Sequence, residues 1–167
     1  MAGPLIILAE MGQADFAWLN GLRREHFPPE RNRVPAHLTL FHAVAPSAED
    51  EARRRLAKAA RSRAPDARID GVMNLGRGAA LRVFSDGLAI VRGDLADAFH
   101  GLLTAQDMAP WRPHITIQNK ADPDAARALV EHLRTTIDPR PLKIAGLQLI
   151  RYADGDWEPL GRWAFSG

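Results

Sequence analysis

The feature that most restricts the fold of this chain is a four-residue pattern that occurs twice. Residues 37–40 read HLTL and residues 114–117 read HITI, and the two copies are separated by 77 positions in a sequence of 167 residues. Each copy lies in a segment typical of a β-strand, where residues two apart point to the same face. The histidine and the threonine of each copy should therefore share one face, and the aliphatic residues should share the other.

The segments around the first copy predict alternating strands and helices. The prolines of residues 27–35 indicate a loop, and Ser85-Asp86-Gly87 indicates a hairpin turn. Acidic residues early and basic residues late in residues 46–65 have the order that a helix dipole favours. We expect strands at 5–11, 36–44, 67–75 and 79–84, with helices at 13–26 and within 46–65.

The same order of elements then starts again. We expect strands at 88–92, 113–119, 142–152 and 157–165, with helices at 94–105 and from Asp122 to about residue 136. Residues 143–147 also resemble residues 68–72, at an offset of 75 that nearly equals the motif offset.

We interpret the chain as one bilobal α+β domain, residues 1–167, with approximate internal repeats at 1–85 and 86–167 related by a pseudo-two-fold axis. Each lobe should be a largely antiparallel sheet with helices packed on its outer face. The two histidine-threonine faces would then line one central groove.

Composition narrows the class of protein. The apolar content of 46% and charged content of 25% are those of an ordinary globular protein. The apolar residues 4–11 have the length of one strand and no basic flank, so we expect a strand rather than a signal peptide, and a cytoplasmic protein. Without cysteines, disulfides and thiolate chemistry are excluded. Of the 22 basic residues 19 are arginine, but a net charge of +2 does not itself argue for nucleic acid.

The paired motif suits acid–base chemistry on a phosphate. One neutral imidazole can take a proton from water or a hydroxyl, and a protonated one can give a proton to the departing oxygen. The threonine hydroxyls can hold phosphate oxygens between the two rings. This arrangement requires no metal.

The two motifs resemble the H-x-T-x pair of the two-histidine (2H) phosphoesterase superfamily, specifically its bacterial 2′-5′ RNA ligase-like or RNA 2′,3′-cyclic phosphodiesterase branch. The resemblance implies a bilobal α+β enzyme that acts without metal or other cofactor on 2′,3′-cyclic phosphate ends or 2′-5′ linkages of RNA or nucleotides. Run backwards, the same chemistry would be ATP-independent 2′-5′ ligation. The resemblance assigns catalysis to His37 and His114, and phosphate binding to Thr39 and Thr116.

Six residues beside the motifs are candidates for contact with the substrate. Phe41 could stack on a base or belong to the core, and Trp111 could stack or plug a loop. Arg31 and Arg33 could bind flanking phosphates. The full set is Arg31, Arg33, Phe41, Trp111, Gln118 and Lys120, the last two because they continue the His114 face.

The other histidines are interpreted as structural or surface residues. His42 should lie on the strand face opposite His37, where no set of zinc ligands is apparent. Two alternatives to an enzyme stay open: a module that binds RNA ends or nucleotides in the same groove with little turnover, and a structural domain with an incidental repeat. We expect a monomer whose partner is its RNA or nucleotide substrate, without a membrane.

Overall fold

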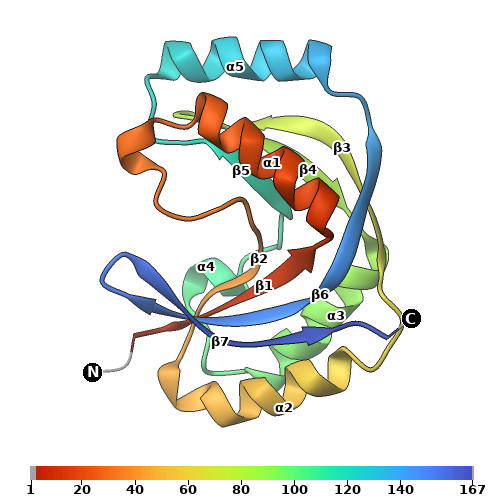
Figure 1. Ribbon diagram of the computed structural model, residues 1–167. Helices are drawn as coiled ribbons and strands as arrows, with labels where there is room; N and C mark the ends of the chain where they lie inside the picture. The colour runs from red at the N-terminus through yellow and green to blue at the C-terminus, as the bar shows by residue number, and fades with distance from the viewer. Residues whose placement is uncertain (1–2, 167) are drawn as a thin grey trace.

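A computed structural model describes residues 3–166, and its strands form one seven-stranded sheet in which every pairing is antiparallel (Figure 1). The strands are β1 (Leu5–Met11), β2 (Leu38–Val44), β3 (Asp66–Asn74), β4 (Ala79–Phe84), β5 (His114–Gln118), β6 (Arg140–Ala153) and β7 (Asp156–Ala164). The α-helices are α1 (Gln13–His26), α2 (Glu49–Ala59), α3 (Asp86–Ala98), α4 (Ala105–Met108) and α5 (Pro123–Thr136), with short 3-10 helices at Pro29–Arg31 and Pro46–Ala48.

The strand order β2-β1-β6-β3-β4-β5, with β7 beside β6, divides into two half-sheets joined by β6. Residues 140–143 of β6 pair with β3, whereas residues 144–153 pair with β1, β7 or both. The two histidine-bearing strands, β2 and β5, stand at opposite ends of this order, and yet they contact each other. The sheet must therefore curl until its first and last strands meet, and this meeting point positions the candidate site.

Helices cover the two half-sheets separately. Helices α1 and α5 pack against β5 and against β3 and β4, respectively, and form the upper part of the molecule in Figure 1. Helix α2 packs against β6 and β7 in the lower part, where it also contacts α3. The bilobal α+β class that the sequence predicts is confirmed. Within residues 3–166, no helix combines the length and the apolar character that crossing a membrane requires.

The elements predicted over residues 85–105 are partly wrong: the helix expected at 94–105 is instead the end of α3, which stops at Ala98. Residues 88–92, expected as a strand, are part of α3, and Ser85-Asp86-Gly87 opens that helix instead of forming a hairpin turn. The hydroxyl of Ser85 accepts a hydrogen bond from the backbone N–H of Leu88 at 3.1 Å, which satisfies one of the free donors of the first turn. Serine, aspartate and glycine suit both turns and helix N-caps, so this stretch did not distinguish the two.

This helix changes how the predicted repeats relate to the half-sheets. The segment after residue 85 supplies no counterpart of β1 before its histidine strand. Strand β4, from residues 1–85, pairs with β5 and carries β3 on its other side. Strand β6, from residues 86–167, pairs with β1 and carries β7. The two predicted repeats therefore exchange strands, and each half-sheet contains residues from both.

Apolar residues of the strands and of α1, α2, α3 and α5 form one main core, and a second, smaller apolar cluster lies on β1 and β6. Ile6, Leu8 and Ile150 are nearly buried there, with Trp157 of β7 packed against them. Leu8, Ile150 and Trp157 border a groove of about 1120 Å³ that reaches His37. The open face of this half-sheet therefore leads directly to the first motif.

Candidate active site

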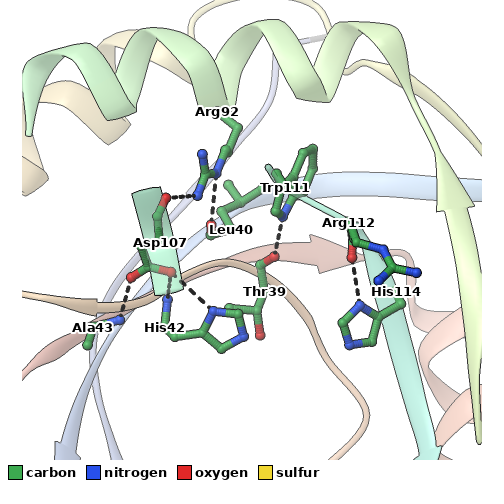
Figure 2. A network of polar contacts seen from close by, with 9 residues as sticks. All are labelled: Thr39, Leu40, His42, Ala43, Arg92, Asp107, Trp111, Arg112 and His114. Atoms are coloured by element: carbon green, nitrogen blue, oxygen red, sulfur yellow. Dashed lines mark hydrogen bonds and ion pairs between the residues drawn. The ribbon is translucent and has the colours of Figure 1, made fainter. Parts of the chain in front are cut away.

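The two motif histidines are held in the same way. Nδ1 of His37 lies 2.8 Å from the carbonyl oxygen of Pro35, and Nδ1 of His114 lies 2.6 Å from the carbonyl oxygen of Arg112 (Figure 2 shows the second pair). A carbonyl oxygen only accepts, so each Nδ1 carries a proton in these contacts. In the neutral ring, Nε2 is then the free acceptor, which is the arrangement a general base requires.

The four motif residues line one cavity. His37, Thr39, His114 and Thr116 face a space of about 220 Å³ between β2 and β5. The threonines are partly exposed, whereas the aliphatic residues between and after the motif positions are fully buried. The alternation expected for a strand thus holds within each motif, and the structure brings both histidine-threonine faces together.

Side chains from the other half of the chain hold the backbone of each motif. Trp111 donates its Nε1–H to the carbonyl oxygen of Thr39 at 3.0 Å (Figure 2). Arg23 of α1, which is 2% exposed, donates to the carbonyl oxygen of Thr116 at 3.0 Å. The same guanidinium donates twice to Asn32 and lies 4.3 Å from the centre of the Phe27 ring. Arg23 therefore links α1 to β5 at the level of the site.

Arg92 of α3 makes the corresponding link to β2. Its guanidinium donates to the carbonyl oxygens of Leu40 at 3.2 Å and Asp107 at 2.6 Å, and lies 4.4 Å from the centre of the Phe41 ring. Each histidine strand is thus braced by an arginine from a helix that precedes the other histidine strand in the sequence.

A β-bulge follows the threonine in both motifs. On β2, Thr39 and Phe41 pair with two adjacent residues of β1, so β2 carries one extra residue between them. On β5, Thr116 and Gln118 pair with two adjacent residues of β4 in the same way. An extra residue reverses the alternation of the side chains that follow it. The positions expected to continue each site face therefore turn into the core.

The bulges overturn two of the predicted contacts. Phe41 is fully buried and packs edge-on against Phe99, with ring centroids 5.8 Å apart, so it belongs to the core. Gln118 is 8% exposed, and its amide nitrogen lies 3.4 Å from the carbonyl oxygen of His26. Neither side chain lines the cavity between the motifs.

The β2 bulge also makes the strand face expected for His42 wrong. A regular strand would put His42 on the face opposite His37, but after the bulge its ring lines the same cavity (Figure 2). Nδ1 of His42 lies 3.1 Å from a carboxylate oxygen of Asp107. Asp107 is 1% exposed and also accepts hydrogen bonds from the backbone N–H groups of His42 and Ala43 at 2.9 and 2.8 Å.

Of the other residues predicted to contact the substrate, one lies at the cavity and three lie elsewhere. Trp111 lines the cavity beside its hydrogen bond to β2. Arg33 is exposed and forms an ion pair with Asp156 at 3.2 Å, next to the turn between β6 and β7. Arg31 and Lys120 are exposed, the latter just after β5 with a φ of 59°. None of these last three is among the described residues that surround the cavity.

The environment of His37 disfavours its charged form. Burial lowers the pKa of His37 to about 4, and the positive charges of Arg23, His42 and His114 act in the same direction. The hydrogen bond to Pro35 opposes this only in part. The His37 ring also meets Trp157 edge-on, with centroids 4.8 Å apart and an interplanar angle of 71°. His37 is therefore neutral at physiological pH in the free protein.

Burial alone would raise the pKa of Asp107. The hydrogen bonds from the His42 ring and from the two backbone N–H groups outweigh that effect, and the pKa of this carboxyl is lowered. Asp107 is thus an ionised carboxylate that orients His42. In residues 3–166, no three His, Asp or Glu side chains come close enough together to hold a metal ion.

Sequence reasoning missed His42, Asp107, Arg92 and Arg112 as parts of this site. Asp107 and His42 are 65 positions apart, and no spacing pattern connects them. Arg112, whose carbonyl holds His114, is also among the residues that line the cavity and was detectable from its place two residues before the second motif.

An α+β fold that carries two histidine-threonine pairs to one cavity defines the class of two-histidine phosphoesterases. The chain belongs to the 2′-5′ RNA ligase superfamily, whose family model matches residues 12–156. The resemblance seen in the two motifs is thereby confirmed. It places the chain in a superfamily of phosphoesterases and 2′-5′ RNA ligase-like enzymes.

Solved structures share the fold over essentially the whole chain. The protein TT0787 of Thermus thermophilus is 19% identical, with 98% of both chains covered and a TM-score of 0.67. A crystal structure described as a phosphoesterase is 24% identical over 100% of both chains, with a TM-score of 0.64. Escherichia coli LigT in complex with 3′-AMP is 21% identical over 100% of both chains, with a TM-score of 0.61. The comparison with curated proteins gives no match.

Proposed function

We propose that this protein hydrolyses 2′,3′-cyclic phosphate ends or 2′-5′ linkages of RNA or nucleotides by metal-independent two-histidine acid–base catalysis. The observation that carries the proposal is the equivalent placement of His37 and His114. Both rings donate Nδ1–H to a carbonyl two residues upstream, and both line one cavity with a threonine of the same strand. Such a pair can accept a proton on one side of a phosphate and deliver one on the other.

The unequal surroundings of the rings suggest their roles. With its pKa lowered to about 4, His37 is neutral and can accept a proton from water through Nε2. The water oxygen bonds to phosphorus while the bond from phosphorus to the departing ribose oxygen breaks. His114, in its protonated form, gives Nε2–H to that oxygen, and a phosphomonoester results. Exchange of protons with solvent restores both rings.

Phosphate binding falls to groups between the two rings. The hydroxyls of Thr39 and Thr116 can donate to non-bridging oxygens, and Arg112, an exposed residue at the same cavity, can offer its guanidinium. Because the backbone of each threonine is fixed by Trp111 or Arg23, little rearrangement is needed when charge develops in the transition state.

The nucleoside part of the substrate fits the groove that begins at His37. That groove is bordered by Leu8, Ile150 and Trp157, which offer an apolar face and an aromatic ring to a base. The LigT structures in complex with 3′-AMP, NADP+ and ATP support nucleotides as the ligand class proposed for this chain as well. In reverse, the same groups would join a 5′-hydroxyl to a cyclic phosphate without ATP.

Hydrolysis of an oligoribonucleotide ending in a 2′,3′-cyclic phosphate, measured in EDTA, tests the proposal. The wild type should turn over, and His37→Ala and His114→Ala should each lower kcat by about a thousandfold. His100→Ala is the matched control, because His100 is exposed beyond the end of α3 and outside the cavity. Wild-type protein that binds the oligonucleotide without turnover, or activity that EDTA abolishes, would contradict the proposed reaction.

A further inference from the structure

The hydrolysis proposed above leaves His42 without a role, although several elements cooperate to place it. The bulge in β2 turns the ring toward the cavity, and the buried carboxylate of Asp107 holds its Nδ1. Arg92 in turn holds the backbone of α4 through the carbonyl oxygen of Asp107. Strand β2, helix α3 and helix α4 thus meet around one imidazole, as Figure 2 shows.

The ring is oriented for contact with a ligand. Its Nδ1 is occupied by Asp107, so Nε2 is the nitrogen left for a ligand. The His42 side chain is 44% exposed, and Figure 2 shows its ring beside Thr39, on the side of His114. Gln106, the neighbour of Asp107, lines the same end of the cavity. This end therefore offers an imidazole and an amide in addition to the two motifs.

Distance along the strand separates this end from the scissile phosphate. Thr39 and His42 are three residues apart, which is roughly 10 Å in an extended strand and somewhat less across a bulge. The proposed hydrolysis already assigns Thr39, Thr116 and the two motif histidines to the scissile phosphate, which leaves the His42 ring available to another group. A neighbouring group of the same substrate is the better match.

We propose that His42, oriented by Asp107, binds a second phosphate group of the substrate next to the scissile one. This inference rests on the proposed function and narrows its substrate class. The protein would prefer nucleotides or RNA ends that carry a 5′-phosphate in addition to the 2′,3′-phosphate, over a nucleoside cyclic phosphate that has no second phosphate.

The charges around His42 fit an anionic ligand. The protonated ring donates Nδ1–H to Asp107 and Nε2–H to a phosphate oxygen, so that it bridges two anions. The other charged or titratable groups that face this end are Arg92 from α3, His37 before β2, and Arg112 and His114 at the start of β5. Since His37 is kept neutral, a protonated His42 beside it meets little repulsion.

Isothermal titration with two product-like ligands tests the inference without depending on turnover. The ligands are adenosine 3′-phosphate and adenosine 3′,5′-bisphosphate. Wild-type protein should bind the bisphosphate about tenfold more tightly, as expected for one charge-assisted hydrogen bond. His42→Ala should remove this preference and leave the affinity for the monophosphate within about twofold. His100→Ala, an exposed histidine away from the cavity, should behave as wild type.

His42→Ala is suited to this test because Asp107 keeps its two backbone donors when the ring is removed. A second variant, His42→Gln, guards against a folding defect, and both variants should unfold as cooperatively as wild type. Equal affinity of the wild type for the two ligands, or equal weakening of both by the His42 variants, overturns the inference. Loss of cyclic-phosphate hydrolysis with an intact bisphosphate preference would instead overturn only the proposed reaction.

Discussion

The motif histidine just before β2, His37, lies against Trp157 and has its pKa lowered to about 4, whereas the motif histidine that opens β5, His114, adjoins Arg112, which is exposed and lines the cavity. The third residue after the motif threonine differs as well: it is His42 on β2 and Asn119 just after the end of β5. Around these differences the two strands share one construction. Each has a carbonyl-bound Nδ1, a bulge after the threonine, and an arginine from a helix of the other half.

Different features of the two strands set the position of the motif side chains and the protonation of the two imidazoles. The shared devices put two imidazoles and two hydroxyls in equivalent positions, and they act through the backbone of the strands. The features that differ are the side chains around the two imidazole rings, and they affect the charge state of those rings. A duplicated scaffold can therefore divide the work of acid and base between two equivalent histidines by changing only their neighbours.

The largest expected effect tests this division directly. A nucleotide ester with p-nitrophenolate as the leaving group needs no proton on departure, so it should depend on the base but not on the acid. On this ester, His114→Ala should stay within about tenfold of wild type, while His37→Ala should lose about a thousandfold in kcat. Rescue of His37→Ala instead of His114→Ala would show that the two roles are reversed.

Substitution of the threonines measures how symmetrically the phosphate lies. Thr39→Val and Thr116→Val should each lower kcat/KM by about ten- to a hundredfold, because each removes a hydrogen bond to a charged oxygen and preserves the side-chain shape. The serine variants should recover most of the activity. If only one valine variant is impaired, the phosphate is held by one strand, and the proposed position of the phosphate between the two threonines is wrong.

The two bracing arginines should differ in their contribution to stability. Arg23→Lys should lower the free energy of unfolding by about 2 kcal/mol, because lysine cannot serve both Asn32 and the Thr116 carbonyl from a buried position. Arg92→Lys should cost about 1 kcal/mol, since Arg92 is only partly buried. Urea unfolding of both variants measures the difference, and equal losses would contradict this ranking.

The smallest effect concerns pH. The native pKa of His37, about 4, lies below the value of 6.5 expected for the unfolded chain, so the unfolded state binds more protons between these values. The stability that the neutral His37 ring contributes to the native state is therefore fully present above pH 6.5. It is lost progressively as the pH falls toward 4. His37→Gln should reduce the loss of stability between pH 7 and pH 5 by about 1 kcal/mol, after allowance for solvent screening. Urea midpoints at both pH values, with His100→Gln as the control, show whether the slope changes.

Much of the fold could be predicted because hydrophobic period and turn residues are local signals. The strand at 5–11 and the helix at 13–26 have the predicted bounds, and the helix after Asp122 begins where its proline indicates. The failure at residues 85–92 is also local, because a serine before an aspartate and a glycine serves equally in a turn or at an N-cap. The exchange of strands between the two halves could not be predicted from the sequence, because strands that pair across long sequence distances leave no local pattern.

The candidate site shows the same boundary between local and non-local information. The shared face of the histidine and threonine in each motif could be predicted, because side-chain alternation within a strand is a local property of the sequence. Phe41, Gln118 and His42 were misplaced because one extra residue in each strand reverses the alternation, and pairing with the neighbouring strand creates that residue. The partner of His42 could not be predicted, because Asp107 belongs to α4, and nothing in the sequence pattern places that short helix beside β2.

The long strand β6 has a consequence for how the protein could be divided. Because β6 belongs to both half-sheets, and because the halves exchange strands, a break between β4 and α3 would leave each fragment with one of the two motif histidines and an incomplete sheet. Neither fragment could perform the reaction by itself, and activity would return only when the two associate. The architecture thus makes the proposed catalysis depend on the assembly of both fragments, as in a split enzyme.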